Sequence, residues 1–365
     1  MNKYTGEVRK RNQTLLIVEG NHEKNELFWL IFKCFPEIHI SMDNVWIYGT
    51  NIYMLYEDIV KEYGSDWVEN EDDIDLPYII SKKKQWEALR YKINFTNIVL
   101  VFDYERHDTG FAEQKIIAMQ NYFTDATDMG RLYINYPMIE SYQHLKAFPD
   151  TDYEERKIPT TMQPGREYKA LVKKESIIGK YIEFPHRVDS LLREHYGVCD
   201  ELKRLRCCNE ILKISDKEHI EILLLDALKQ VITDARIHTA KYQFMDWMKK
   251  LGYVCKSQTY WQQMRELFQQ IIHHNICKAN RIQNNCYRIK EDQYKECFEN
   301  LDFTEILKLQ NLSSQDSAHG FIWVLNTCVL FVAEYNFALL SEYKEGTPWD
   351  TTSAPSLADE TPYRN

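Results

Sequence analysis

Carboxylates follow two apolar runs of the chain, at the points where each run would end as a buried strand. Glu19 comes directly after residues 15–18, and Asp103 and Glu105 follow residues 97–102. The carboxyl ends of parallel strands meet at one edge of a sheet, where ligands bind in open α/β folds. Acids gathered there without basic partners repel one another, and a divalent cation relieves that repulsion. The pattern therefore predicts a metal site at this edge.

Two further acids are expected to approach the same edge. Gly20 permits a sharp turn after the first strand, which places Glu23 in the first turn of the following helix. Glu140 follows another apolar run, residues 131–136. Each also has a purely structural interpretation, because a carboxylate at a helix N-terminus interacts favourably with the helix dipole.

The ligand types indicate which ion this would be. Carboxylate oxygens suit hard cations, so we expect Mg²⁺ or Mn²⁺. The nine cysteines include no Cys-x-x-Cys pair, and no Cys/His cluster has the spacing of zinc ligands. The thiols are interpreted as reduced and mostly buried, as in a cytoplasmic protein, and the polar start of the chain does not resemble a secretory signal.

Alternating apolar runs and amphipathic stretches predict the scaffold. Their order predicts an α/β fold with a mostly parallel sheet flanked by helices. Strands are expected at residues 13–18, 45–49, 97–102 and 131–136, and helices at 22–34, from Asn51 through Ile59, at 82–92 and at 111–123.

A proline-containing stretch at 149–166 is expected to end this α/β domain, assigned to residues 1–150. Residues 166–341 are then expected to form an all-helical domain for dimerisation or for docking of substrate or partner, and 342–365 a disordered tail. Residues 321–340 are strongly apolar. A buried core helix is preferred to a membrane span, because the segment contains Glu334 and lacks flanking basic residues.

The net charge of −10 argues at first against a nucleic-acid-binding protein. The excess of acidic residues is concentrated, however, in residues 1–150, which carry 24 acidic and 16 basic side chains. A loose basic group farther along could follow a nucleic-acid backbone, although a solvated helix face is the alternative. It comprises Lys180, Arg187, Lys203, Arg204 and Arg206.

The acids at 19, 23, 103, 105 and 140 resemble the site of a TOPRIM domain, the metal-binding α/β module of topoisomerases, primases and OLD-type nucleases. The resemblance covers about residues 13–146. It implies acid–base catalysis and metal contact by Glu19, with Glu23 as the acid four residues later. The family's Asp-x-Asp corresponds to Asp103-Tyr104-Glu105, in which Glu replaces the second Asp and changes the reach of that ligand. Glu140 corresponds to the later acid.

The resemblance also implies a catalytic lysine, which Lys169 or Lys173 could supply. Glu26, one turn after Glu23, either stands beside the metal or belongs to a solvated helix face. Arg106 either contacts a phosphate or has a structural role in its loop.

The layout is similar to the stand-alone TOPRIM effectors of bacterial anti-phage systems, especially those of the PARIS type. That similarity implies a dimeric, toxic, Mg²⁺-dependent endonuclease that cleaves cellular RNA, with tRNA favoured. It also implies an ABC-type ATPase partner that holds the effector inactive until a trigger releases it. Two alternatives stay open: an OLD-like TOPRIM DNase, and a non-catalytic module that binds a metal–nucleotide or a partner. A primase-like enzyme ranks below these, because the chain has no zinc-binding region.

Overall fold

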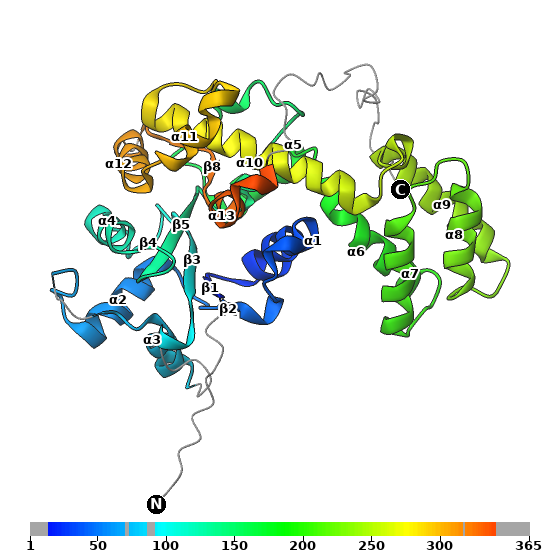
Figure 1. Ribbon diagram of the computed structural model, residues 1–365, viewed down its shortest axis with the longest axis horizontal. Helices are drawn as coiled ribbons and strands as arrows, with labels where there is room; N and C mark the ends of the chain where they lie inside the picture. The colour runs from blue at the N-terminus through cyan, green and yellow to red at the C-terminus, as the bar shows by residue number, and fades with distance from the viewer. Residues whose placement is uncertain (1–13, 70–72, 86–91, 317, 341–365) are drawn as a thin grey trace, which may run out of the picture. The chain divides into compact units, whose positions relative to one another are not determined.

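The computed structural model describes residues 14–69, 73–85, 92–316 and 318–340 (Figure 1). Its main sheet is mixed and mostly parallel, with strand order β2-β1-β3-β5-β4, and β8 pairs with β5. β4 and β8 are the antiparallel members. The strands are β1 (Thr14–Val18), β2 (Val45–Ile47), β3 (Asn97–Asp103), β4 (Thr124–Asp125), β5 (Gly130–Tyr136) and β8 (Leu325–Asn326). The expected α/β class with a mostly parallel sheet is confirmed.

The two central strands are apolar along their length because both of their faces are covered. Residues 15–18 of β1 have no exposed surface, and β3 is buried from Ile98 to its end. Such continuous apolar runs are typical of strands buried on both faces. The register pairs Val18 with Val101, so the two strands end at the same edge of the sheet.

Helices cover both faces of this sheet. Figure 1 shows α2 and α4 on one side and α1 and α13 on the other. Asn51 caps α2, because its side chain accepts a hydrogen bond from the backbone N–H of Met54. The elements of this part are the π-helix η1 (Glu23–Phe28), α1 (Trp29–Cys34), η2 (Pro36–Ile38), η3 (Met42–Asn44), α2 (Ile52–Tyr63), α3 (Leu76–Lys84), η4 (Lys92–Asn94), α4 (Glu113–Tyr122) and η5 (Ile139–Gln143).

The helix expected at 82–92 is misplaced. α3 begins earlier, where Asp75 caps it by accepting a hydrogen bond from the backbone N–H of Tyr78 and Pro77 occupies its first turn. It ends at Gln85, whose backbone is left-handed. Residues 86–91 lie outside the described residues, as does the tail expected at 342–365.

The expected single boundary near residue 150 does not match the division of the chain. One compact unit contains residues 14–144, 151–175 and 271–340, and the other contains 145–150 and 176–270, within the described residues. The chain returns to the first unit because its late segments pair with earlier ones. β8 adds to β5, and β6 (Lys157–Pro159) pairs with β7 (Phe321–Trp323).

The single helix expected over residues 321–340 is wrong. The segment is divided into β7, β8, η10 (Cys328–Leu330), α13 (Phe331–Tyr335) and η11 (Phe337–Leu340). Its polar residues explain this, since Thr327 donates a hydrogen bond to the carbonyl of Ile134 and Asn326 to that of Ile139. No helix among the described residues is long and apolar enough to cross a membrane.

The second unit is helical. Pro185 lies inside α6 and leaves the carbonyl of Tyr181 without its helical donor. The hydroxyl of Tyr260 donates to that carbonyl at 2.6 Å. The helices are α6 (Gly179–Glu194), α7 (Glu201–Lys213), α8 (Ile220–Lys229), α9 (Arg236–Leu251) and η8 (Val254–Lys256), and α10 (Tyr260–Asn284) begins there. The remaining elements are η6 (Tyr153–Glu155), η7 (Pro164–Tyr168), α5 (Lys169–Glu175), η9 (Glu291–Gln293), α11 (Tyr294–Glu299) and α12 (Phe303–Ser313).

A substitution at Asn326 tests how much the late segment, residues 321–340, contributes to stability. Asn326 is fully buried, and its amide donates to Ser141 as well as to Ile139 while accepting from the N–H of Val329. We expect Asn326→Leu to lower the free energy of unfolding by about 2–4 kcal/mol, because buried partners lose their hydrogen bonds. Urea unfolding measures this. The exposed Asn300→Leu should cost less than about 0.5 kcal/mol, and equal effects would contradict the account.

Candidate metal centre

Three carboxylates meet at the carboxyl edge of the sheet. One ligand oxygen from each of Glu19, Asp103 and Glu105 lies within 4.8 Å of the others. Glu19 follows β1, Asp103 ends β3, and Glu105 lies two residues beyond. The structure thus brings together the three acids that the sequence placed at this edge.

Backbone hydrogen bonds fix Glu19 at the rim. Its N–H donates to the carbonyl of Val101 at 3.1 Å, and its carbonyl accepts from Gly49 at 2.9 Å, which continues the sheet past β1. Its Oε2 accepts from the backbone N–H of Asp103 at 3.1 Å. The side chain is therefore held over the end of the neighbouring strand.

Glu105 reaches the cluster through an unusual backbone conformation. Its φ is 44°, in the left-handed region that a glutamate rarely adopts. The preceding Tyr104 is fully buried, and its hydroxyl donates to Asn311 at 2.6 Å. The N–H of Asp108 donates to the carbonyl of Glu105 at 3.0 Å and closes a turn. Strain of this kind persists only where the surroundings impose it, and it concentrates at functional sites.

Asp103 is buried, and Asn135 on β5 supports it. The amide of Asn135 donates to Oδ1 of Asp103 at 3.3 Å, and its own Oδ1 accepts from the N–H of Cys328 at 3.4 Å. Sequence reasoning missed Asn135. The available signal was a polar residue inside the apolar run of β5, at the position paired with Asp103.

Glu23 has a structural and an electrostatic role at once. Its Oε2 accepts from the backbone N–H of Gly20 at 2.8 Å, so it stabilises the turn after β1. It is nevertheless only 3 % exposed, and its negative charge raises the pKa of both Glu19 and Asp103. The two interpretations of Glu23 are thus compatible.

Glu140 and Lys169 form an ion pair beside the three acids. Nζ of Lys169 lies 2.9 Å from Oε1 of Glu140, while Oε2 is buried and has no hydrogen-bond partner among the described residues. Burial and the charge of Asp108 raise the pKa of Glu105, and the charge of Lys169 partly opposes that rise. Lys173 is exposed on α5, so the geometry favours Lys169 as the lysine of the site.

The two additional candidates make other contacts. Glu26 pairs with His22 at 3.0 Å on the surface of η1, in agreement with the solvated interpretation. The guanidinium of Arg106 donates to the carbonyl of Ser314 at 3.1 Å and lies 4.2 Å from the ring centre of Phe111. Its contacts support a structural role in its loop.

Burial and mutual repulsion dominate the electrostatics of this edge. Burial, followed by the charges of Glu105, Glu23 and Asp108, raises the pKa of Glu19 to about 8, although the N–H of Asp103 opposes the change. Burial, followed by the charges of the neighbouring acids, raises the pKa of Asp103 well above its ordinary value; these acids are Glu19, Glu23, Glu140 and Glu105. Without a cation the cluster therefore holds protons at neutral pH.

The donor set fits a hard divalent cation. Its ligands are carboxylates only, their ionised forms repel one another, and the buried Oε2 of Glu140 has a free lone pair nearby in the same unit. A bound cation would supply the positive charge that lets these groups ionise together. Glu19, Asp103 and Glu105 are the residues that would hold it.

Comparison with known families, with curated proteins and with solved structures finds no match for this chain. The functional assignment therefore rests on the residues of the site and on their resemblance to the TOPRIM pattern.

The raised pKa of Glu19 predicts how stability depends on pH. The folded, metal-free protein keeps a proton up to about pH 8 that the unfolded chain releases above its ordinary value of 4.5. Because the native state binds more protons in this window, the free energy of unfolding should fall as pH rises from about 5 to about 8 in EDTA.

We expect Glu19→Gln to reduce that pH dependence and to raise the free energy of unfolding at about pH 8 by about 1–3 kcal/mol. Added Mg²⁺ should stabilise the wild type but not the variant. Thermal unfolding across this pH range measures both effects, with Glu26→Gln as the matched control. Parallel curves for the wild type and Glu19→Gln would contradict the assignment of the proton to this cluster.

Proposed function

We propose that the chain is a TOPRIM-type nuclease that hydrolyses phosphodiester bonds with the help of Mg²⁺ or Mn²⁺. The observation that carries the proposal is the convergence of Glu19, Asp103 and Glu105 within 4.8 Å at the carboxyl edge of the sheet. The Glu140–Lys169 pair beside them adds a cation, which an ordinary acidic surface lacks.

Each side chain has a distinct part in this reaction. Glu19, Asp103 and Glu105 would hold the metal, and Glu140 is available through its unpartnered oxygen. When bound, the ion would polarise the scissile phosphate and lower the pKa of the attacking water. Glu23 holds the turn that carries Glu19, through the N–H of Gly20.

Glu19 is the group that would transfer the proton in this reaction. With the cation bound, Glu19 would be ionised, and its carboxylate could accept a proton from the attacking water and return it to the leaving oxygen. Lys169 keeps its positive charge, because the hydrogen bond and charge of Glu140 raise its pKa against the effect of burial. It would stabilise the negative charge that develops on the phosphate.

We further propose the biological role that the TOPRIM resemblance implies. The chain would be a toxic effector of a bacterial anti-phage system, with tRNA as the favoured substrate. An ABC-type ATPase would hold it inactive until triggered, and the released form would be a homodimer. The support is the acidic site together with a separate helical unit that is available for docking.

Cleavage assays test the activity directly. We expect the purified protein to convert tRNA into discrete fragments with Mg²⁺ or Mn²⁺ and not with EDTA. Glu19→Gln should lower kcat by at least about 10³-fold, since it removes a metal ligand and the proton acceptor. Glu26→Gln, the same substitution at a surface position of η1, should stay within about 2-fold.

Ribosomal RNA and plasmid DNA are assayed alongside tRNA. Cleavage of DNA alone would replace the tRNA proposal by an OLD-like DNase with the same site. Tight metal binding without turnover of any substrate would contradict the nuclease and leave the non-catalytic binding module.

Lys169 provides a second test. We expect Lys169→Gln to lower kcat by about 10²–10³-fold with little change in KM, because the charge acts on the transition state. Lys173→Gln, on the exposed side of α5, should behave like the wild type. A loss confined to KM would instead make Lys169 a substrate-binding residue.

A further inference from the structure

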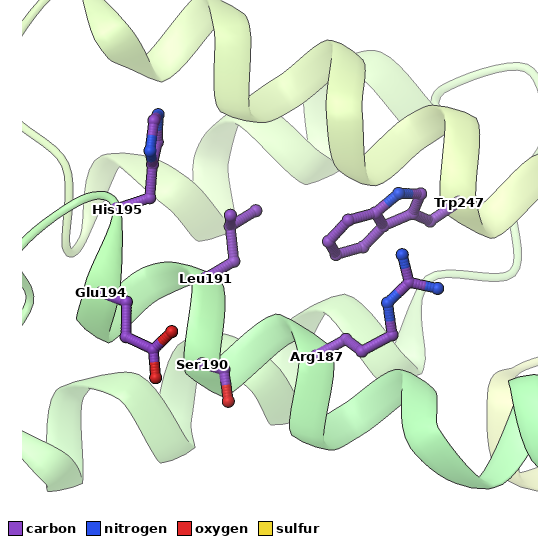
Figure 2. A pocket seen from close by; sticks show the side chains of 6 residues that line it. All are labelled: Arg187, Ser190, Leu191, Glu194, His195 and Trp247. Atoms are coloured by element: carbon purple, nitrogen blue, oxygen red, sulfur yellow. The ribbon is translucent and has the colours of Figure 1, made fainter. Parts of the chain in front are cut away.

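The helical unit contains a hollow of about 390 Å³ between α6 and α9 (Figure 2). One face of α6 forms most of its wall, since residues 187, 190, 191 and 194 recur at helical spacing. His195 follows at the end of the same helix, and Trp247 contributes from α9. Its volume is near the lower end of the range for small-ligand sites.

A stacked arginine and tryptophan dominate this hollow. The guanidinium carbon of Arg187 lies 4.3 Å from the ring centre of Trp247, and Figure 2 shows the two side chains directed toward each other. Phe244 packs against Trp247 in an edge-to-face arrangement, with 5.6 Å between the ring centres. Arg187 is exposed and forms no ion pair within the part of the chain that the structure describes.

Among the charged groups in and near the hollow, Arg187 is the one that determines the charge of the ligand it would bind. Glu194 is the acidic residue that lines the hollow, and Arg193 lies 2.8 Å from it at the surface. Arg204, a member of the basic group noted in the sequence, is buried and bound to Asp189 at 2.8 Å and to backbone carbonyls. It therefore has a structural role, whereas Arg187 faces solvent.

These features match a ligand that is planar and anionic. Unpaired bases stack on aromatic rings and on guanidinium planes, and arginine binds phosphate through its planar fork of donors. Leu191 and Trp247 provide the apolar surface, and Ser190 and His195 provide hydrogen-bonding groups. A duplex would present its bases stacked and paired, so the Arg187–Trp247 stack suits an unpaired base.

We propose that this hollow binds one unpaired nucleotide of the RNA substrate, with the base on the Arg187–Trp247 stack and the phosphate at the guanidinium of Arg187. The inference rests on the proposed nuclease function, because it names the substrate class as RNA with an accessible single-stranded base. It adds a binding site in the helical unit to the acidic site in the α/β unit.

Binding is measured with the full-length chain carrying Glu19→Gln, in EDTA, so that no cleavage interferes. Fluorescence anisotropy with labelled oligouridylate and oligoadenylate gives the affinity. Trp247→Ala should weaken binding by about 5–100-fold, the range for losing one base–aromatic stack. Arg187→Gln should weaken it by about 10-fold and reduce its salt dependence, while Arg187→Lys should restore the salt dependence without the full affinity.

Lys249→Gln is the matched control, because it removes one exposed positive charge from α9, the helix of Trp247, outside the hollow. It should change the affinity by less than about 2-fold. Trp247→Phe keeps the packing of α9 and should weaken binding only slightly, and circular dichroism identifies any variant that fails to fold. Folded Trp247→Ala and Arg187→Gln variants with wild-type affinity would overturn the proposal, as would an oligonucleotide that does not bind at all.

Cleavage by the chain with native Glu19 is a separate readout. Substitutions in the hollow should raise KM with kcat nearly unchanged, since they remove uniform binding of the substrate. RNA binding that depends on Arg187 and Trp247 without any cleavage would overturn the nuclease function and leave an RNA-binding module. Cleavage with an unchanged KM in both variants would retain the nuclease and overturn the nucleotide site.

Discussion

Repulsion among three carboxylates, Asp103 buried and Glu19 and Glu105 half-buried, is the constraint on which the rest of this structure depends. Glu19, Asp103 and Glu105 occupy one edge of the sheet, and burial raises the pKa of each. A protein that needed only stability would replace such a group by apolar side chains. The fold instead surrounds the acids with fixed donors, among them the backbone N–H of Asp103 and the amide of Asn135.

The scaffold that holds this edge is assembled from distant parts of the chain. Asn311 and Ser314, at the end of α12, bind the hydroxyl of Tyr104 between the two acids of the Asp-x-Glu motif. The returning segment also carries Cys328, whose N–H donates to Asn135. Residues 271–340 are therefore part of the unit that positions the site, so truncation near residue 150 would remove supports of the acidic cluster.

Local patterns in the sequence predicted the parts of this structure that local physics determines. The apolar runs gave the positions of β1, β3 and β5, and the parallel order of the strands placed Glu19 beside Asp103. The helix expected from Asn51 was also found, as α2, and Asn51 caps it.

The rest depends on contacts between residues far apart in the chain. The segment at 321–340 is apolar over a long run, which favoured one buried helix, but hydrogen bonds from Asn326 and Thr327 to earlier segments divide it into short pieces. The choice of Lys169 over Lys173 required knowledge of where α5 lies relative to Glu140. Glu105 reaches the site through a left-handed backbone that no local pattern indicates.

Crystals of the full-length protein grown with Mn²⁺ would test the central claim most directly. Anomalous diffraction locates the ion independently of any activity. We expect one peak at the edge of the sheet, bonded to an oxygen of each of Glu19, Asp103 and Glu105 at about 2.0–2.3 Å, and no such peak in Glu19→Gln crystals. A cluster without a metal at saturating Mn²⁺, with Lys169 turned into it as the counter-charge, would contradict the metal centre and the nuclease mechanism that depends on it.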